Sequence, residues 1–400
     1  GASSKVTSTL ATTQIKNNKA IAATGTDGRG GGFALFAGAE VELTDGTTTL
    51  NQAKRGGGVY VDASTFKMHT HTIGPTNKAT VDDGGGLYLI GATVSATTDL
   101  ASVIISNEAA RHGGGVYMLS AAGTASYTLT GTNSKIESNT AVQHGGGVYA
   151  DGAAVTVTVD DTALIKSNTA TLNGGGVYGT NSATIKVKGT SVVESNTAVD
   201  GGGLYMLKAT CQVTSSTLKS NTATGNGGGW HADGSTMTLT DVTVTTNTAT
   251  TNGGAGYMTK AIAGAGFTSS VDLTGASSQV TSNTATTGGG GGVYFHDSTT
   301  GTITSATLKS NTATAGAGGG MYVSTSAVVT MAGAVIDGNI AGTDGGGVYV
   351  TGASSKMTST GATTRIMNNK ADNAGGGFAL FSGAEVELTA GTTTLNQAKR

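Results

Sequence analysis

The stretch KIESNTAVQHGGGVYA, residues 135–150, joins two short motifs that recur along the whole chain. The first is Asn-x-Ala, and the second is a glycine cluster followed by an apolar residue and usually a tyrosine. The last glycine of each cluster falls at residue 32, 58, 86, 115, 147, 176, 203, 229, 256, 292, 320, 347 and 377. The motif therefore recurs about every 28 residues, and a period of this length indicates a solenoid, in which each repeat contacts only its neighbours.

The asparagines of the Asn-x-Ala motif keep one register with the glycine clusters. We expect them to form corners of the coils, because Asn and Gly tolerate left-handed backbone conformations most readily. Stacked at one level, their amides would hydrogen-bond to one another as a ladder. The predicted ladder consists of Asn18, Asn51, Asn77, Asn107, Asn139, Asn168, Asn196, Asn221, Asn247, Asn283, Asn311, Asn339, Asn369 and Asn396.

Short stretches of alternating polarity lie between the two motifs. Examples are Val41 to Thr44 and Met237 to Thr240, which predict half-buried strands. One coil then holds three strands: the tyrosine stretch, the alternating stretch and the apolar stretch that leads to the asparagine. We therefore predict an all-β, right-handed parallel β-helix of about 13–14 coils of about 28 residues, with three parallel sheets.

Composition narrows the class of protein further. The 400 residues include 67 glycines without a Gly-X-Y period, which excludes collagen, and charged residues make up 12% with a net charge of -2. A nucleic-acid partner would need a clustered basic face, and a membrane span would need about 18 consecutive apolar residues; neither occurs. The single cysteine, Cys211, excludes an internal disulfide framework. No motif calls for a cofactor.

A second, longer period lies above the coils. Residues 1–20 return with few changes as residues 352–371, and residues 30–55 return as residues 375–400. Residues 1–55 and 352–400 are thus near-identical copies of the start of a larger block, with an offset of 351 residues in the first part and 345 in the second. Neither end has a polar capping segment. We expect residues 1–400 to be a single continuous solenoid and a window of a longer tandem protein.

Ten tyrosines occupy one position after the glycine clusters, and His231 replaces the tyrosine once. Because their neighbours in the strand are apolar, alternation would place the neighbours inward and the tyrosines outward. Such a stripe is either a stabilising stack on a solvated face or a surface that docks a second fibre, a partner chain or sugar rings. The column consists of Tyr60, Tyr88, Tyr117, Tyr149, Tyr178, Tyr205, Tyr257, Tyr294, Tyr322 and Tyr349.

Polar residues precede the glycine clusters and form another column, which we expect to be solvated turns. Stacking would bring Arg55 near Asp83 and His112 near His144. Two imidazoles are too few for a metal site, and His69 and His71, which would share a strand face, are likewise not expected to bind metal. The column consists of Arg29, Arg55, Asp83, His112, His144, Asn173, Asp200, Asn226, Asn252 and Asp344. We expect Cys211 and Trp230 to point inward as core residues.

With these motifs in place, the chain resembles the repeats of polymorphic outer-membrane proteins, in which Phe-x-x-Asn alternates with Gly-Gly-Ala-apolar. The resemblance covers essentially the full chain, with Ile136 and Leu218 where the Phe would stand and Gly115 and Gly147 in place of the Ala. It implies a β-helical, surface-exposed passenger of the autotransporter or adhesin type. It transfers no catalytic residues.

The sequence favours a structural role: a stiff extracellular fibre, surface filament or stalk that assembles with itself end to end or laterally. The alternative is a cell-surface adhesin that binds glycans or other surface proteins through the tyrosine column. Ice binding is less favoured, because outward pairs such as Thr238 and Thr240 do not recur in every coil. A polysaccharide-degrading enzyme would need convergent carboxylates, whereas the only adjacent acidic pairs are Asp82–Asp83 and Asp160–Asp161. We therefore predict no enzyme activity.

Overall fold

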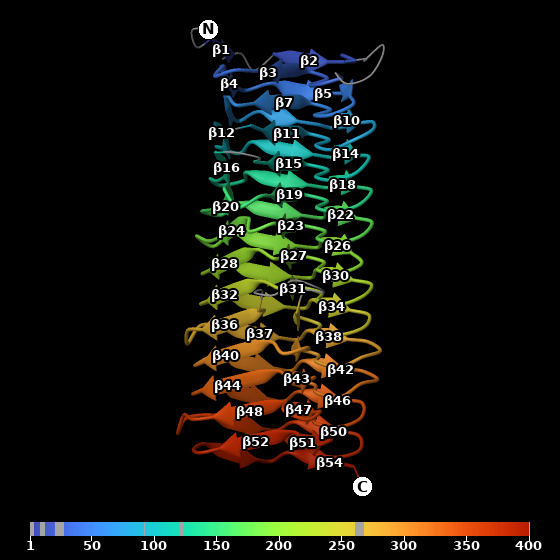
Figure 1. Cartoon of the computed structure of the whole chain (residues 1–400), viewed down its shortest axis with the longest axis vertical. Coiled ribbons are helices and arrows are strands. Elements are labelled where there is room, and N and C mark those ends of the chain that lie inside the picture. Colours follow the sequence, from blue (N-terminus) through green and yellow to red (C-terminus); the bar gives the residue numbers. More distant parts are fainter. Residues whose placement is uncertain are drawn as a thin grey trace. The chain divides into compact units, whose positions relative to one another are not determined.

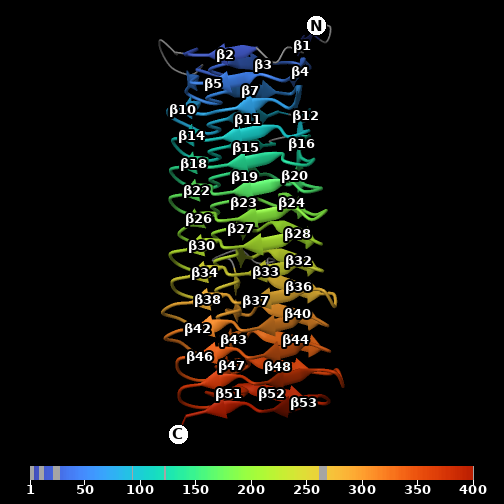
Figure 2. The same cartoon turned by 180° about the vertical axis from the view of Figure 1, so that it is seen from behind.

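A computed structural model describes residues 4–8, 13–20, 28–91, 93–120, 123–260 and 268–399. The copied segments therefore include residues 1–3, 9–12, 21–27 and 400 outside the described part. The chain forms two compact units, residues 1–198 and 199–400. All regular elements of the described residues are β-strands, and Figures 1 and 2 show them in the order of the chain.

One coil contains four strands rather than the predicted three. In the coil around residues 148–170 these are β19 (Val148–Asp151), β20 (Val155–Val159), β21 (Leu164–Lys166) and β22 (Thr169–Ala170). Each pairs in parallel with its equivalent in the next coil, so each unit has four parallel sheets. We name them the tyrosine, long, lead and short sheets, in that order. The short sheet was missed because strands of two residues show no alternation of polarity.

The first unit contains the following strands. The tyrosine sheet has β3 (Phe33–Leu35), β7 (Val59–Asp62), β11 (Leu87–Ile90), β15 (Val116–Leu119), β19 and β23 (Val177–Thr180). The long sheet has β1 (Lys5–Ser8), β4 (Glu40–Thr44), β8 (Thr65–His69), β12 (Thr93–Asp99), β16 (Thr124–Leu129), β20 and β24 (Thr184–Val187). The lead sheet has β2 (Gln14–Lys16), β5 (Thr47–Thr49), β9 (Thr72–Ile73), β13 (Val103–Ile105), β17 (Lys135–Glu137), β21 and β25 (Val192–Glu194). The short sheet has β6 (Gln52–Ala53), β10 (Lys78–Ala79), β14 (Glu108–Ala109), β18 (Thr140–Ala141), β22 and β26 (Thr197–Ala198).

The second unit repeats the same order. Its tyrosine sheet has β27 (Leu204–Leu207), β31 (Trp230–Asp233), β35 (Gly256–Thr259), β39 (Val293–Phe295), β43 (Met321–Ser324), β47 (Val348–Thr351) and β51 (Phe378–Phe381). Its long sheet has β28 (Thr210–Thr214), β32 (Thr236–Thr240), β36 (Ser270–Thr274), β40 (Thr300–Thr304), β44 (Val328–Ala332), β48 (Lys356–Ser359) and β52 (Glu385–Leu388). Its lead sheet has β29 (Thr217–Lys219), β33 (Thr243–Thr245), β37 (Gln279–Thr281), β41 (Thr307–Lys309), β45 (Val335–Asp337), β49 (Arg365–Met367) and β53 (Thr392–Thr394). Its short sheet has β30 (Thr222–Ala223), β34 (Thr248–Ala249), β38 (Thr284–Ala285), β42 (Thr312–Ala313), β46 (Ile340–Ala341), β50 (Lys370–Ala371) and β54 (Gln397–Ala398).

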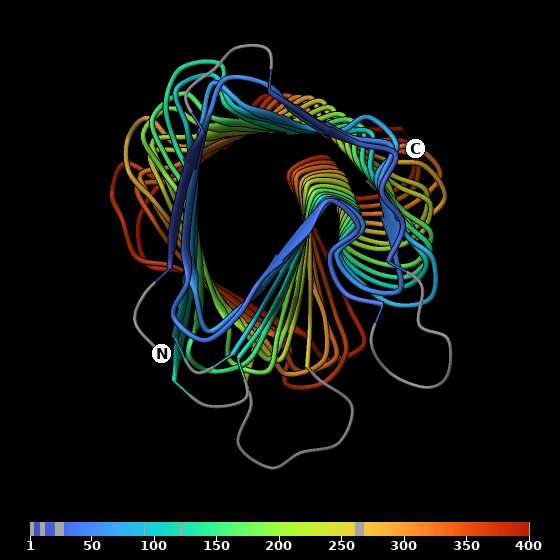
Figure 3. The same ribbon diagram turned by 90° about the horizontal axis from the view of Figure 1, so that it is seen from above.

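The asparagine ladder is confirmed in both units. The Nδ2 of Asn139 donates to Oδ1 of Asn168 at 3.0 Å and to the carbonyl oxygen of Ile104 at 2.9 Å, and its backbone N–H donates to the same Oδ1 at 2.9 Å. Asn139 and Asn168 are fully buried. Figure 3 shows that, within each unit, equivalent segments of successive coils overlie one another.

The left-handed backbone conformation at this corner belongs to the residue before each asparagine, and not to the asparagine as we expected. Ser138, for example, has φ 56° and precedes Asn139. The asparagine itself must orient its side chain along the stack, so the sharp change of direction falls one residue earlier. Residues with positive φ at this position are Asn17, Leu50, Thr76, Ser106, Ser138, Ser167, Ser195, Ser220, Thr246, Ser282, Ser310, Gly338, Asn368 and Leu395.

The glycines of a cluster are required for two reasons, a left-handed backbone conformation and close approach to the next coil, as residues 145–147 illustrate. Gly145 has φ 66°, a region that L side chains rarely adopt. A Cβ on Gly146 would lie 2.5 Å from the backbone carbon of Thr169 in the short sheet of the next coil. A Cβ on Gly147 would lie 2.5 Å from the Gly176 oxygen of the next coil. The cluster therefore lets the chain turn and pass close to the next coil.

The core between the sheets is apolar, and both predicted core residues lie in it. Cys211 and Trp230 are 0% and 1% exposed. Trp230 pairs in register with Gly256 of β35, where a Cβ would lie 2.0 Å from the indole Cε2. The indole thus occupies the space that a side chain would take in the next coil.

Replacing a ladder asparagine is expected to destabilise the coil locally. Asn139→Ala removes an amide that accepts hydrogen bonds from Asn107 and donates to Asn168 and Ile104. Because it leaves their buried groups unpaired, we expect the free energy of unfolding to fall by about 2–4 kcal/mol. Chemical denaturation followed by circular dichroism measures this. The neighbouring exposed Thr140→Ala is the control, and an equal effect in both variants would contradict the role of the ladder.

A double-mutant cycle tests the pairing of Trp230 with Gly256. Gly256→Ala places a methyl group against the indole, and overpacking of a core typically costs about 1–3 kcal/mol. Trp230→Val removes the indole, so the same glycine substitution should cost far less in that background. Thermal denaturation of the four proteins gives the coupling energy, and strictly additive effects would show that the two positions do not compete for space.

Candidate functional site

The tyrosines of the first unit form a continuous stack of rings on the tyrosine sheet. The ring centroids of Tyr60 and Tyr88 lie 5.0 Å apart, those of Tyr88 and Tyr117 4.7 Å, and those of Tyr117 and Tyr149 5.2 Å. Tyr149 and Tyr178 follow at 5.1 Å with an interplanar angle of 3°. The parallel register of the sheet places each ring directly against the next.

The second unit has an equivalent column, in which His231 lies between Tyr205 and Tyr257. The centroids of these two tyrosine rings lie 4.6 and 4.9 Å from that of the imidazole. The stack continues with Tyr257 to Tyr294 at 5.3 Å and Tyr294 to Tyr322 at 4.3 Å. Tyr322 and Tyr349 follow at 4.7 Å.

The tyrosines do not form the solvated stripe that we expected from strand alternation. In the first unit their exposed fractions are only 3–8%, and in the second unit Tyr205 is buried and the last four rings are half-buried. The outer face of the sheet is covered by the segment that precedes each glycine cluster in the preceding coil. His112 stacks on Tyr149 at 4.5 Å and His144 on Tyr178 at 4.7 Å.

Phenylalanines extend the column in a way that the sequence analysis missed. The repeated segment GGGFALF has alanine at the tyrosine position, as Ala34 beside Tyr60 and Ala379 beside Tyr349. The aromatic ring stands two residues later instead. The ring centroid of Phe36 lies 5.6 Å from that of Tyr60, and the ring centroid of Phe381 lies 5.4 Å from that of Tyr349. The signal was present in the second Phe of GGGFALF.

The polar column before the glycine clusters is less solvated than predicted. Asp83 and His112 are only 5% and 8% exposed. The expected approach of His112 and His144 is confirmed, with their rings stacked at 5.2 Å. The expected approach of Arg55 and Asp83 is confirmed on the backbone, where the N–H of Gly56 donates to the carbonyl oxygen of Asp83 at 3.1 Å. The side chain of Arg55 pairs with the adjacent Asp82 at 2.9 Å, and the carboxylate of Asp83 accepts the backbone N–H of His112 at 3.0 Å.

Burial shifts the pKa values of this cluster in opposite directions. Desolvation, followed by the nearby charge of His144, lowers the pKa of His112 to about 4, and desolvation also lowers the pKa of His144. Desolvation raises the pKa of Asp83 to about 6, against the opposing charge of Arg111. The buried Nδ1 atoms of both histidines have no hydrogen-bond partner within the described residues. The site therefore keeps its imidazoles neutral near pH 7.

His69 and His71 do not share a face, contrary to our expectation. The strand ends at His69, and Thr70 follows with φ 48°, so the chain turns between the two histidines. His69 contacts the carboxylates of Asp99 and Glu42. His71 is fully buried, with Nε2 3.0 Å from the Thr48 hydroxyl.

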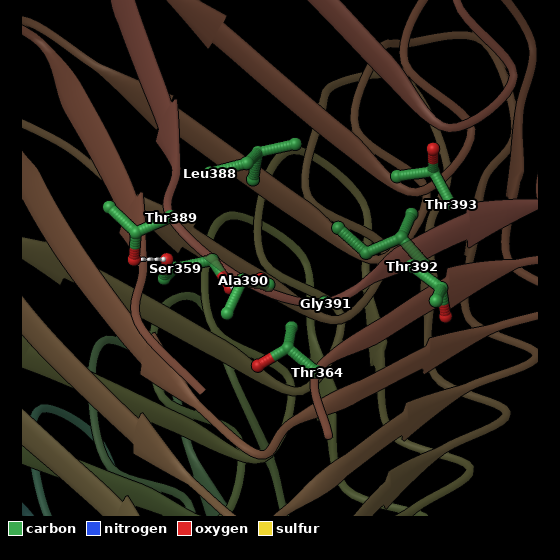
Figure 4. A pocket seen from close by; sticks show the side chains of 9 residues that line it. Ser359, Thr364, Leu388, Thr389, Ala390, Gly391, Thr392 and Thr393 are labelled. Atoms are coloured by element: carbon green, nitrogen blue, oxygen red, sulfur yellow. Dashed lines mark hydrogen bonds between the residues drawn. The ribbon is translucent and has the colours of Figure 1, made fainter. Parts of the chain in front are cut away.

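Other candidate sites carry little chemistry. The hollow shown in Figure 4 is lined by Ser359, Thr364, Leu388, residues 389–391 and the start of β53, without an acidic or imidazole group. Thr389 Oγ1 donates to the carbonyl oxygen of Ser359 at 2.9 Å. In the part of the chain that the structure describes, no three His, Cys, Asp or Glu residues come together as metal ligands would. None of the described segments forms a helix of the length and hydrophobicity that a membrane crossing needs.

The comparison with known families agrees with the arrangement of the strands. The family model described as a right handed beta helix region matches residues 201–364. The chain is an all-β, right-handed parallel β-helix with coils of about 28 residues, about 13 in number. No curated protein and no solved structure shows significant similarity to it. Right-handed β-helices occur both in polysaccharide-degrading enzymes and in proteins without enzyme activity, so the fold by itself assigns no reaction.

The buried histidines predict a loss of stability in acid. The pKa of His112 is about 4 in the folded protein, below the value of 6.5 in the unfolded chain. Its contribution is therefore complete above about pH 6.5 and is lost as the pH falls towards about pH 4, on the order of 3 kcal/mol. Asp83 acts in the opposite sense, because its pKa is raised.

Denaturation of His112→Phe at about pH 7.5 and about pH 4.5 isolates the contribution of His112. The phenylalanine keeps a ring on Tyr149 but cannot take up a proton. We expect the wild-type protein to lose more of its free energy of unfolding between the two pH values than the variant. Equal losses would show that His112 is not the group that titrates.

Proposed function

We propose that this protein is a structural protein, which forms a stiff extracellular fibre, surface filament or stalk by stacking its β-helical coils. The observation that carries the proposal is that the same asparagine hydrogen bonds connect successive coils. Within each unit the same amide bonds recur at 2.9–3.1 Å, from Asn18 to Asn196 in the first and from Asn221 to Asn396 in the second. Because any two successive coils can form these hydrogen bonds, the number of coils in the solenoid has no built-in limit.

Charged side chains also pair between successive coils. Lys78 contacts Glu108 at 2.7 Å, and Lys166 contacts Glu194 at 3.0 Å. Exposed pairs of this kind contribute little stability individually. Both pairs connect one coil to the next, which supports a surface adapted to the neighbouring coil rather than to a ligand.

The longer period supports extension beyond a single block. Residues 352–371 and 375–400 restate residues 1–20 and 30–55, so the chain carries the beginning of the same block twice. We propose that the chain belongs to a longer tandem solenoid that assembles with copies of itself, end to end or laterally, outside the cell or on its surface.

An adhesin that binds glycans through the tyrosine column is the less favoured alternative. A sugar ring packs against the face of an aromatic side chain, whereas the faces of the inner rings, such as Tyr294 between Tyr257 and Tyr322, are occupied by their neighbours. The half-buried rings of the second unit offer mainly their edges. The specific feature in favour of an adhesin is that these edges are accessible at all.

Immunogold electron microscopy of intact, unpermeabilised cells tests the proposal. Antibodies raised against the purified chain should label continuous linear structures outside the cell. A parallel glycan-array measurement compares the wild-type protein with Tyr322→Ala. Labelling confined to the cell interior contradicts the extracellular fibre, and saturable glycan binding that is lost in Tyr322→Ala would favour the adhesin.

A further inference from the structure

One pair of rings in the second unit is closer and more nearly parallel than its neighbours. The centroids of Tyr294 and Tyr322 lie 4.3 Å apart with an interplanar angle of 8°. The adjacent contacts, Tyr257 to Tyr294 and Tyr322 to Tyr349, have longer distances of 5.3 and 4.7 Å and angles of 34° and 37°. Tyr294 and Tyr322 are direct partners in the parallel pairing of β39 and β43.

The pair lies in the half-buried part of the column, together with Tyr257 and Tyr349. The segment before each glycine cluster covers the tyrosine of the next coil, and at Tyr322 the covering residue is Gly289. A Cβ on Gly289 would lie 2.4 Å from Cδ2 of Tyr322, so no side chain covers the ring from this position, and Tyr322 is half-buried. The corresponding cover of Tyr149 is the imidazole of His112, and Tyr149 is only 8% exposed.

The phenol of Tyr294 has a polar neighbour from the next coil. The hydroxyl of Ser324 donates to the Tyr294 oxygen at 3.3 Å. Burial raises the pKa of both phenols, so both are neutral at physiological pH and each carries a hydrogen that oxidation can remove.

We propose that Tyr294 and Tyr322 are an oxidative cross-linking site, at which a one-electron oxidant joins two successive coils through a dityrosine bond. Each phenol gives one electron to the oxidant and one proton to solvent, which leaves two tyrosyl radicals side by side. Coupling of two ortho carbons forms one carbon–carbon bond. The two ortho hydrogens then move to the phenol oxygens, so two tyrosines and two oxidant molecules yield one cross-link, two reduced oxidant molecules and two protons.

The cross-link would fasten coils that are otherwise held only by hydrogen bonds and packing. The bond joins Tyr294 and Tyr322, which are 28 positions apart in the chain (322 − 294), and it constrains the unfolded state as a disulfide does. This inference goes beyond the fibre proposal and does not depend on it, because it rests on ring distance, alignment and access within the second unit.

Photo-oxidation of the full chain tests the site, with a ruthenium tris(bipyridine) complex and persulfate as the oxidant. Trypsin then yields the peptides 261–309, whose only tyrosine is Tyr294, and 310–356, which contains Tyr322 and Tyr349. We expect a cross-linked pair of these peptides whose mass is their sum less two hydrogen atoms, together with dityrosine fluorescence. The unfolding midpoint of the monomeric, oxidised protein should rise.

Two comparisons make the test specific. Tyr322→Phe keeps the ring stack but removes the phenol, so the cross-linked pair should disappear while the circular dichroism spectrum stays unchanged. The covered pair Tyr117 and Tyr149, with parallel rings 5.2 Å apart, lies on the peptides 112–135 and 136–166 and should cross-link several-fold less at the same dose. The proposal is overturned if the 261–309 and 310–356 pair persists in Tyr322→Phe, if Tyr117 and Tyr149 couple first, or if the tyrosines only gain oxygen.

Discussion

The buried asparagine ladder is the interaction on which the other features of this protein depend. A corner between parallel strands leaves backbone groups without sheet partners, and an unpaired buried polar group costs about 1–3 kcal/mol. Each asparagine solves this for two coils at once: the Oδ1 of Asn168 accepts two hydrogen bonds from Asn139, and the Nδ2 of Asn139 satisfies the carbonyl of Ile104. A coil is therefore incomplete without the asparagine of its neighbour, and the stacking is built into the corner.

The glycine clusters and the aromatic column follow from that fixed register. The hydrogen bonds between Asn139 and Asn168 fix the spacing of their two coils. The glycine turn at residues 145–147 must therefore pass within contact distance of Thr169 and Gly176, which leaves no room for side chains. The strand that leaves this turn then places Tyr149 directly against Tyr178. Ring stacking is thus a consequence of the ladder spacing, and it adds packing along the same axis.

Sequence periodicity was sufficient to predict the solenoid, the ladder and the inward position of Cys211 and Trp230, since each of these repeats or alternates with neighbours in one strand. It was insufficient where burial depends on a segment without regular pattern. Tyr149 alternates outward from its strand, but the irregular segment that ends in His112 covers it. The two-residue strand Thr169–Ala170 lies within the Asn-x-Ala motif but is too short to show an alternation of polarity, so its pairing with Thr140–Ala141 identifies it as a strand. The ion pair of Arg55 with Asp82, next to Asp83, depends on side-chain direction, which spacing does not encode.

The segment that covers the tyrosine sheet differs between individual coils of the two units. In the first unit the residues that cover the rings are large: Arg29 lies 5.4 Å from the centre of the Tyr60 ring, and His112 and His144 stack on the rings of the next coils. In the second unit Gly289 occupies that position over Tyr322 and has no side chain. The side chain over the ring therefore varies from coil to coil along an otherwise uniform column. The ladder holds the coils in the same register, whereas the residue before each glycine cluster varies, so the groups next to the tyrosine rings differ between coils.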